Sequence, residues 1–289
     1  GYAISYYYFG YLIAAMLADL SAVNSGIAFN LMLATLFAQA GVGALGVVYN
    51  LVRAAGRFGR LRPSGAGGAI ASLRRGSAPV LRETPDDAVL SGDVRRMACY
   101  AMLPYANRIA DAAFEFGGRR WQLRRNFGDH PHSLHGIGWQ RAWQVEAASP
   151  TRVRLALRHA GDADWPFPFR AVQEIALEDG LSIRIALTNT GAGAAPAGFG
   201  FHPFFPRAPE SRADFNAARG WRNGPDMLPV RGDLAPVYAV GVDNDFEGWD
   251  GEVRIGSTVL RADPVFRWLR LFAPEDRPFI AAEPVTHAA

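Results

Sequence analysis

The stretch Leu181-Ser182-Ile183-Arg184-Ile185-Ala186-Leu187 alternates apolar side chains with polar or small ones, which is the period of a strand with one buried face. A similar alternation runs through residues 152–158, where apolar residues alternate with arginine or alanine. Further short apolar runs at 172–177, 253–255 and 268–272 are separated by Gly, Pro, Asp and Asn. Short strands punctuated by turns from residue 63 onward predict a mainly β protein built as an antiparallel sandwich or barrel.

The first 52 residues have a different composition. They carry one charged side chain, Asp19, and residues 26–52 form an apolar run long enough for a transmembrane helix of about 20 residues. A second, shorter apolar run covers residues 2–18. We therefore predict an apolar helical, transmembrane segment at residues 1–52, with a buried helical hairpin in a soluble protein as the alternative.

Four arginines follow these apolar runs, within a basic linker at residues 53–62. By the positive-inside rule, this end of the second span faces the cytoplasm. We therefore expect the β-rich part, residues 63–289, to be cytoplasmic and anchored to the membrane through residues 1–52.

The sequences SYYYFGY at residues 5–11 and AFNL at residues 28–31 resemble a family of large multi-span bacterial and archaeal membrane proteins named for its triple tyrosine. The resemblance covers about 50 residues and includes no catalytic motif. It implies that residues 1–52 are a fragment of a membrane region joined to another gene product, either by natural fusion or by an error of assembly.

The distribution of charge and the single cysteine argue against several classes of function. All 30 basic residues are arginine, and acidic residues are interspersed among them, so no block of like charge predicts a nucleic-acid partner. Cys99 alone cannot form an intramolecular disulfide or a multi-cysteine metal site, and we expect it to be a small buried residue. The sequence GVGALG at residues 41–46 matches G-x-G-x-x-G but lacks the strand and the acidic residue of a dinucleotide site, so we reject a nucleotide cofactor.

Five groups of polar residues lie in aromatic, proline-containing segments. In the second group, histidines at positions 130, 132 and 135 suggest a metal site, but Pro131 and Gly136 favour a loop over the helix face on which metal ligands are commonly spaced. A sugar site is more natural there, because neutral imidazoles donate to and accept from hydroxyls, and Trp139 and Trp143 could stack on a pyranose. In the fifth group, Glu283 follows an apolar run, which should raise its pKa and makes it a candidate base. The groups are residues 104–109, 129–136, 200–206, 243–246 and 283–287.

The five groups occur in the order found in the aldose 1-epimerase, or galactose mutarotase-like, family, and the segment WPFPFR at residues 165–170 resembles that family too. The resemblance runs from about residue 63 to the C-terminus. It implies a large antiparallel β-sandwich with an open sugar cleft, no cofactor and no metal. The family continues for a closing segment beyond Glu283, so we expect a C-terminally truncated domain with an unpaired sheet edge.

Position by position, the resemblance implies that His202 is the general acid and Glu283 the general base. It further implies that the sugar ring and its hydroxyls are bound by Asn107, Arg108, His135 and Asp243.

The reaction implied is the interconversion of the α and β anomers of an aldohexose similar to glucose or galactose. It needs a proton removed from the C1 hydroxyl and one delivered to the ring oxygen, which a carboxylate and an imidazole can do near neutral pH. The alternatives are a non-catalytic carbohydrate-binding module, a hexose-6-phosphate 1-epimerase with an arginine cluster for the phosphate, and a membrane protein whose function lies in its N-terminal part. The preferred aldose and the oligomeric state stay open.

Overall fold

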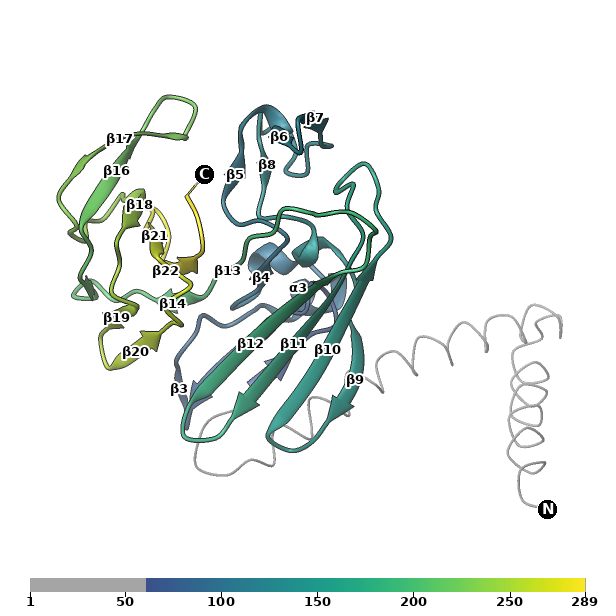
Figure 1. Ribbon diagram of the computed structural model, residues 1–289. Coiled ribbons are helices and arrows are strands. Elements are labelled where there is room, and N and C mark those ends of the chain that lie inside the picture. Colours follow the sequence, from purple (N-terminus) through teal and green to yellow (C-terminus); the bar gives the residue numbers. More distant parts are fainter. Residues whose placement is uncertain (1–60, 289) are drawn as a thin grey trace, which may run out of the picture. The chain divides into compact units, whose positions relative to one another are not determined.

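The computed structural model describes residues 61–288, which lie within one compact unit (Figure 1). Strands dominate this part of the chain, so the prediction of a mainly β protein is confirmed. The predicted transmembrane segment at residues 1–52 and most of the basic linker lie outside the described residues. Between residues 61 and 288, no helix is both long and apolar enough to cross a membrane.

The alternating stretches of the sequence form an antiparallel four-stranded sheet with the order β12-β11-β10-β9. β11 and β12 pair through nine consecutive residues without a bulge. The apolar residues of β10 and β11 that face the interior, such as Val153, Leu155 and Ile175, are at most 2% exposed. The four strands are β9 (Gln144–Ala148), β10 (Arg152–His159), β11 (Phe169–Leu177) and β12 (Leu181–Asn189).

A larger antiparallel sheet has the order β17-β16-β18-β21-β22-β13-β4, and β14 also pairs with β22. Its central strand, β22, is buried along all seven residues, which explains why its sequence is almost entirely apolar. The strands are β4 (Ala101–Met102), β13 (Gly200–Phe201), β14 (Phe204–Pro206), β16 (Arg219–Asn223), β17 (Pro229–Leu234), β18 (Asp243–Glu247), β21 (Trp268–Phe272) and β22 (Phe279–Val285).

Smaller elements complete this part of the chain. Two three-stranded sheets have the orders β1-β2-β3 and β15-β19-β20, and two two-stranded sheets are β5-β8 and β6-β7. These strands are β1 (Leu61–Pro63), β2 (Ile70–Arg75), β3 (Ala78–Pro79), β5 (Arg108–Ile109), β6 (Ala113–Phe116), β7 (Arg119–Gln122), β8 (Ser133–Leu134), β15 (Ala213–Phe215), β19 (Glu252–Ile255) and β20 (Thr258–Arg261). The helices are the α-helix α3 (Asp86–Ser91) and the single-turn helices η1 (Val94–Arg96), η2 (Ala110–Ala112) and η3 (Gly138–Gln140).

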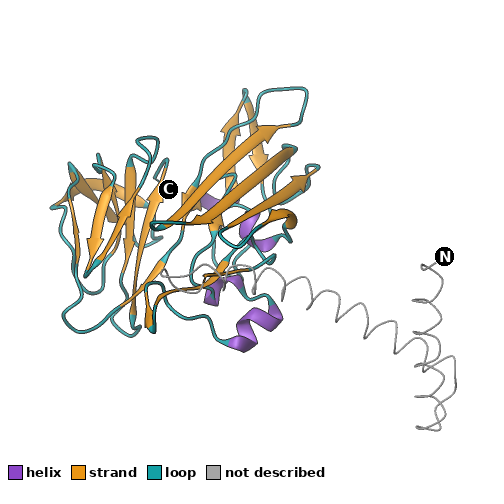
Figure 2. Cartoon of the chain, turned by 90° about the horizontal axis from the view of Figure 1, so that it is seen from below, coloured by secondary structure: helices purple, strands orange, loops and turns teal. Residues whose placement is uncertain are grey.

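One contiguous apolar core joins the two main sheets. It includes Leu155 and Ile175 from the four-stranded sheet and Phe246, Leu269 and Leu271 from the larger one. Figure 2 shows the strands gathered in two groups with loops passing between them. The core therefore holds the larger sheet, which carries most of the polar groups singled out from the sequence, in a fixed relation to the smaller one.

Candidate active site

Two neighbouring segments of the larger sheet bring His202 and Glu283 together. Glu283 lies on β22, and His202 lies in the connection between β13 and β14, both of which pair with β22. The backbone N–H of His202 donates to the carbonyl of Tyr100 at 2.9 Å, which fixes the start of this connection. The Nε2 atom of His202 is 3.3 Å from Oε1 of Glu283. Two residues separated by 81 positions in the sequence are thus in direct contact.

The imidazole of His202 is enclosed by other rings. Its centroid lies 4.3 Å from that of Phe204, 4.8 Å from that of Tyr100 and 5.4 Å from that of His135, which it meets edge-on. The guanidinium of Arg82 lies 3.4 Å from the centroid of Phe204. These rings exclude water from His202, which is 6% exposed, while Glu283 is 1% exposed.

This burial shifts both pKa values in the direction of the neutral forms. Desolvation, together with the nearby His135 and Arg82, lowers the pKa of His202 well below its usual range. Desolvation raises the pKa of Glu283 to about 8, against the opposing charge of Arg270. Near neutral pH both groups are therefore in their neutral forms. The contact thus joins a neutral carboxyl group to a neutral imidazole, and the raised pKa of Glu283 has the direction expected from the sequence.

Three buried polar atoms at this place have no hydrogen-bond partner among the described residues 61–288. They are Nδ1 of His202, Oε2 of Glu283 and Nδ1 of His135. Buried polar atoms are nearly always hydrogen-bonded, so three unpaired ones beside each other indicate a site for a polar ligand. Two imidazole nitrogens and a carboxyl oxygen suit the hydroxyls and ring oxygen of a sugar.

His135 is fixed by its backbone. Its N–H donates to the carbonyl of Asn107 at 2.8 Å, just beyond the point where β8 pairs with β5. The next residue, Gly136, has φ +68°, and a Cβ there would lie 2.0 Å from the carbonyl oxygen of Leu103, so glycine is required. Desolvation, with a contribution from Arg108, lowers the pKa of His135 to about 3. Its imidazole is therefore neutral and can both donate and accept.

A network of charged groups continues from Glu283 across the sheet. Arg270 on β21 is the strand partner of Glu283, and it contacts Asp245 at 3.0 Å and also Asp243. The amide of Asn107 donates to both carboxylate oxygens of Asp245, at 2.9 and 3.0 Å. Asp245 and Arg270 are at most 3% exposed, so this is a buried ion pair with an additional amide donor.

Arg108 and Asp243 form the outer part of this network. The Nη2 atom of Arg108 is 3.4 Å from Oδ2 of Asp243, and its Nη1 donates to Oδ1 of Asn107 at 3.3 Å. Asp243 keeps 32% of its side chain exposed, whereas the Nε atom of Arg108 is buried without a partner. Both residues can therefore still bind a ligand, but the amide nitrogen of Asn107 is already committed to Asp245.

The structure thus brings the six predicted site residues into two adjoining groups. His135, His202 and Glu283 form the first group, and Asn107, Arg108 and Asp243 form the second. The two groups meet where Asn107 contacts His135 and where Arg270 lies opposite Glu283. Whether these residues bind or convert a sugar stays a prediction.

One expected ligand-contacting residue is in a different place. Trp143 lies in the apolar core, 4% exposed, and its indole N–H donates to the carbonyl of Gly138, so it cannot stack on a sugar. Trp139 is closer to the site, since its ring lies 6.1 Å from that of Tyr100, but its indole N–H also donates to backbone carbonyls. Both tryptophans are therefore packing residues in the folded chain.

The other two histidines of the loop already accept hydrogen bonds from backbone N–H groups. Nδ1 of His132 accepts from the backbone N–H of Asp111, and Nδ1 of His130 accepts from the backbone N–H of His132. Within residues 61–288, no group of three His, Cys, Asp or Glu residues is arranged to hold a metal ion.

Sequence reasoning missed three residues of the site. Asp245 is two residues after Asp243, so strand alternation could have placed both on one face. Arg270 interrupts the apolar strand WLRLF, and a charge in a buried strand is itself a signal of a buried partner. Tyr100, which packs on His202, has no such signal in the sequence.

Comparisons with known proteins identify related sequences and structures. Residues 55–245 match the family model described as aldose 1-epimerase, and residues 1–84 match a family of uncharacterised membrane proteins (DUF2298). The uncharacterised Escherichia coli protein YphB is 32% identical over 208 residues, which are 68% of this chain and 69% of YphB. Glu283 lies beyond the part matched by the epimerase model.

Solved structures show the same fold. A candidate aldose 1-epimerase from Escherichia coli K12 superimposes with a TM-score of 0.73 at 28% identity, covering 80% of this chain and 86% of that one. A galactose 1-epimerase from Lactobacillus acidophilus superimposes with a TM-score of 0.64 at 15% identity, covering 81% and 84% of the two chains. The galactose mutarotase-like sandwich expected from the sequence is confirmed, and the chain belongs to the aldose 1-epimerase family.

Proposed function

We propose that this protein is an aldose 1-epimerase that interconverts the α and β anomers of an aldohexose, with His202 and Glu283 as the acid and base. The observation that carries the proposal is the buried contact at 3.3 Å between these two side chains, each with a further unpaired polar atom. Membership of the aldose 1-epimerase family supports it independently.

The proposed reaction moves two protons and breaks one ring bond. A base takes the proton of the C1 hydroxyl while an acid protonates the ring oxygen, and the bond between C1 and the ring oxygen breaks to give the open-chain aldehyde. Rotation about the C1–C2 bond turns the other face of the carbonyl to the C5 hydroxyl. Ring closure then reverses both proton transfers.

The close contact of the two buried side chains suits this alternation. Ring opening needs the proton on His202 and a charged Glu283, and it leaves a protonated Glu283 and a neutral His202. Ring closure needs that second arrangement. The two arrangements differ only by the place of one proton between atoms 3.3 Å apart, and burial favours the neutral one in the free protein.

The surrounding groups are proposed to orient the sugar. His135 and Arg108 have unpaired nitrogens, and Asp243 is partly exposed, so these three are the substrate-binding candidates. The two arginines of the network, Arg108 and Arg270, face two carboxylates, which leaves these four residues without net charge. This arrangement favours a neutral aldose over a hexose 6-phosphate.

We also propose that residues 1–52 anchor the enzyme in a membrane, with the epimerase on the cytoplasmic side. The match of residues 1–84 to a membrane protein family and the four arginines at residues 53–62 support this. Expression without residues 1–60 should keep epimerase activity and lose membrane association. Membrane association that survives this deletion would contradict the anchor.

Polarimetry of freshly dissolved α-glucose and α-galactose tests the activity. Glu283→Gln and His202→Asn should each lower kcat by about 10²–10⁴-fold with little change in KM, because they remove proton transfer but keep size. Glu210→Gln, an exposed glutamate in a loop, is the matched control and should leave the rate unchanged.

Two results would exclude the proposal. A protein that binds sugars without accelerating mutarotation above buffer would be a carbohydrate-binding module. A Glu283→Gln variant with near-normal kcat would remove the carboxyl group from the mechanism.

A further inference from the structure

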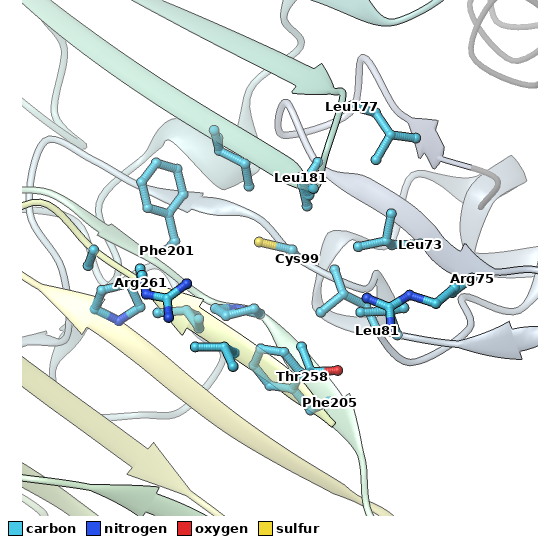
Figure 3. Close-up of a pocket in the computed structure, with 18 of the residues that line it drawn as sticks. Leu73, Arg75, Leu81, Cys99, Leu177, Leu181, Phe201, Phe205, Thr258 and Arg261 are labelled. Carbon is cyan, nitrogen blue, oxygen red and sulfur yellow. The ribbon is translucent and has the colours of Figure 1, made fainter. Parts of the chain in front are cut away.

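His202 and Phe204 lie on one face of the segment that carries them. The residues that alternate with them, Phe201, Pro203 and Phe205, line a cavity of about 570 Å³, and Figure 3 shows the two phenylalanines around it. This alternation is that of an extended chain, whose successive side chains point to opposite faces. The imidazole and the phenyl ring of Phe204 therefore both face away from the cavity. Their centroids are 4.3 Å apart, so Phe204 is the ring on which the candidate acid is stacked.

Arg82, in the connection between β3 and α3, covers the other face of Phe204. The central carbon of its guanidinium lies 3.4 Å from the centroid of the phenyl ring. A guanidinium and an imidazole this close to one ring would overlap if they lay on the same face, so the ring of Phe204 lies between Arg82 and His202. A cation over an aromatic face is attracted by the negative charge of the π-electrons. Arg82 therefore holds Phe204 from one side while His202 stacks on the other.

Backbone hydrogen bonds fix Arg82 in this position. Its Nε and Nη2 atoms both donate to the carbonyl of Met97, at 3.1 and 2.8 Å. The next carbonyl, that of Ala98, accepts from the N–H of Phe204 at 2.9 Å. The N–H of Arg82 in turn donates to the carbonyl of Phe204 at 2.8 Å. A displacement of Arg82 would therefore be transmitted to the backbone and the ring that hold His202.

The charge of Arg82 has no acidic partner nearby. Among residues 61–288, no carboxylate lies within ion-pair distance of its guanidinium, which contacts backbone carbonyls and aromatic rings. Desolvation accordingly lowers the pKa of Arg82 to about 10. Burying part of a charge without a counter-ion costs free energy, and an apolar side chain could fill the same space without this cost. Packing alone therefore does not explain an arginine at this position.

Several other groups act on the imidazole of His202. The carboxyl group of Glu283 and the rings of Tyr100 and His135 lie against it, and Arg270 is the strand partner of Glu283. We propose that Arg82 is a positioning residue that acts through Phe204: it holds the ring on which His202 stacks and so keeps Nε2 of His202 directed at Glu283. Its positive charge also opposes a second positive charge on the imidazole. For its role in catalysis this inference rests on the proposed epimerase reaction.

Arg82→Gln tests the inference, because it removes the charge and keeps an amide that can donate to Met97. In polarimetry it should lower kcat by about 10–100-fold with KM nearly unchanged, since a small displacement of His202 slows proton transfer. With less opposing charge, His202 takes up a proton at higher pH, so the acid limb of the pH–rate profile should move up by about one unit. Arg82→Lys keeps the charge and should leave this limb in place. Arg119→Met, which removes an exposed arginine 4.2 Å from the ring of Trp121, is the matched control and should change neither quantity.

A double-variant cycle shows whether Arg82 acts through Phe204. Phe204→Leu removes the ring, so adding Arg82→Gln to it should change kcat by no more than about twofold. Losses of kcat that multiply in the double variant would overturn the inference. A loss confined to KM, or an acid limb that stays in place for Arg82→Gln, would also overturn it.

A measurement without catalysis separates this inference from the proposed function. The ring C–H signals of His202 in NMR spectra, identified by their absence in His202→Asn, depend on how the imidazole lies on Phe204. They should move in Arg82→Gln and stay in place in Arg119→Met. If Arg82→Gln does not fold, Arg82→Lys, which loses the paired bonds to Met97, should move them instead. Absence of mutarotation in the unaltered protein would refute the proposed function, whereas unmoved His202 signals in the folded Arg82 variant would overturn this inference.

Discussion

Arg270→Met should destabilise the fold and change the titration of Glu283 at the same time. Arg270 contacts Asp243 and Asp245, and Asp245 is completely buried. Methionine leaves Asp245 with the amide of Asn107 as its remaining contact. Breaking a buried ion pair costs about 3–5 kcal/mol. Because the two amide hydrogen bonds survive, we expect the lower end of this range, about 3 kcal/mol.

Urea denaturation followed by tryptophan fluorescence measures this loss. The double variant Arg270→Met with Asp245→Asn should recover about 1–2 kcal/mol, because it no longer buries an unpaired charge. Arg261→Met is the control, since it breaks an ion pair with Glu252 whose arginine is 71% exposed, and such pairs contribute less than about 1 kcal/mol. A loss for Arg270→Met as small as that of the control would refute the reasoning.

The same variant makes a prediction about catalysis. The charge of Arg270 favours the ionised form of Glu283, so its removal should raise the pKa of Glu283 further above about 8. The alkaline limb of the pH–rate profile, where Glu283 loses its proton, should then move to higher pH. A limb that stays in place would show that Arg270 does not tune this carboxyl group.

Three further predictions follow from burial and backbone geometry. Between pH 4.5 and about 8, the folded protein keeps a proton on Glu283 that the unfolded chain has released. The free energy of unfolding should therefore fall by up to about 1.4 kcal/mol per pH unit across this window. Urea titrations at several pH values should show a smaller fall per pH unit for Glu283→Gln. Equal slopes would contradict the raised pKa. Gly136→Ala should cost about 2–4 kcal/mol and displace His135, whereas Gly117→Ala, with φ +60° but open space, should cost less, as thermal unfolding of the two variants would show. Burial raises the pKa of the Cys99 thiol to about 12, so a thiol reagent at pH 8 should label it only after unfolding; rapid labelling of the native protein would contradict this.

The sequence predicted the strands well because their pattern is local. The alternation at residues 152–158 and 181–187 corresponds to β10 and β12 in the structure, because a strand with one buried face imposes a period of two. At β12 the same alternation predicted one buried face, and its apolar residues Leu181 and Ile183 are half-buried. Alternation reports which face a side chain takes, and it contains no information about whether a neighbouring strand covers that face.

The order of the motifs in the sequence predicted which residues form the candidate site. It did not predict the hydrogen bonds and ion pairs among them. His202 and Glu283 were paired by resemblance, yet their direct contact depends on β13 and β14 both lying beside β22. Asn107 was expected to bind the sugar, but its amide nitrogen donates to Asp245. Such hydrogen bonds form between segments that lie side by side only in the folded protein, so no local sequence pattern predicts them.

The contact between His202 and Glu283 also sets a limit on affinity. A sugar that binds Nε2 of His202 or Oε1 of Glu283 must first displace the contact between these two atoms, whereas Nδ1 of His202 and Oε2 of Glu283 can accept or donate new hydrogen bonds. At the two contacting atoms, only the difference between the new and the old interactions contributes to binding, which is about 1 kcal/mol or less for an exchange of this kind. In the proposed epimerase reaction, these two atoms would interact most strongly with the sugar at the moment when charge develops on the ring.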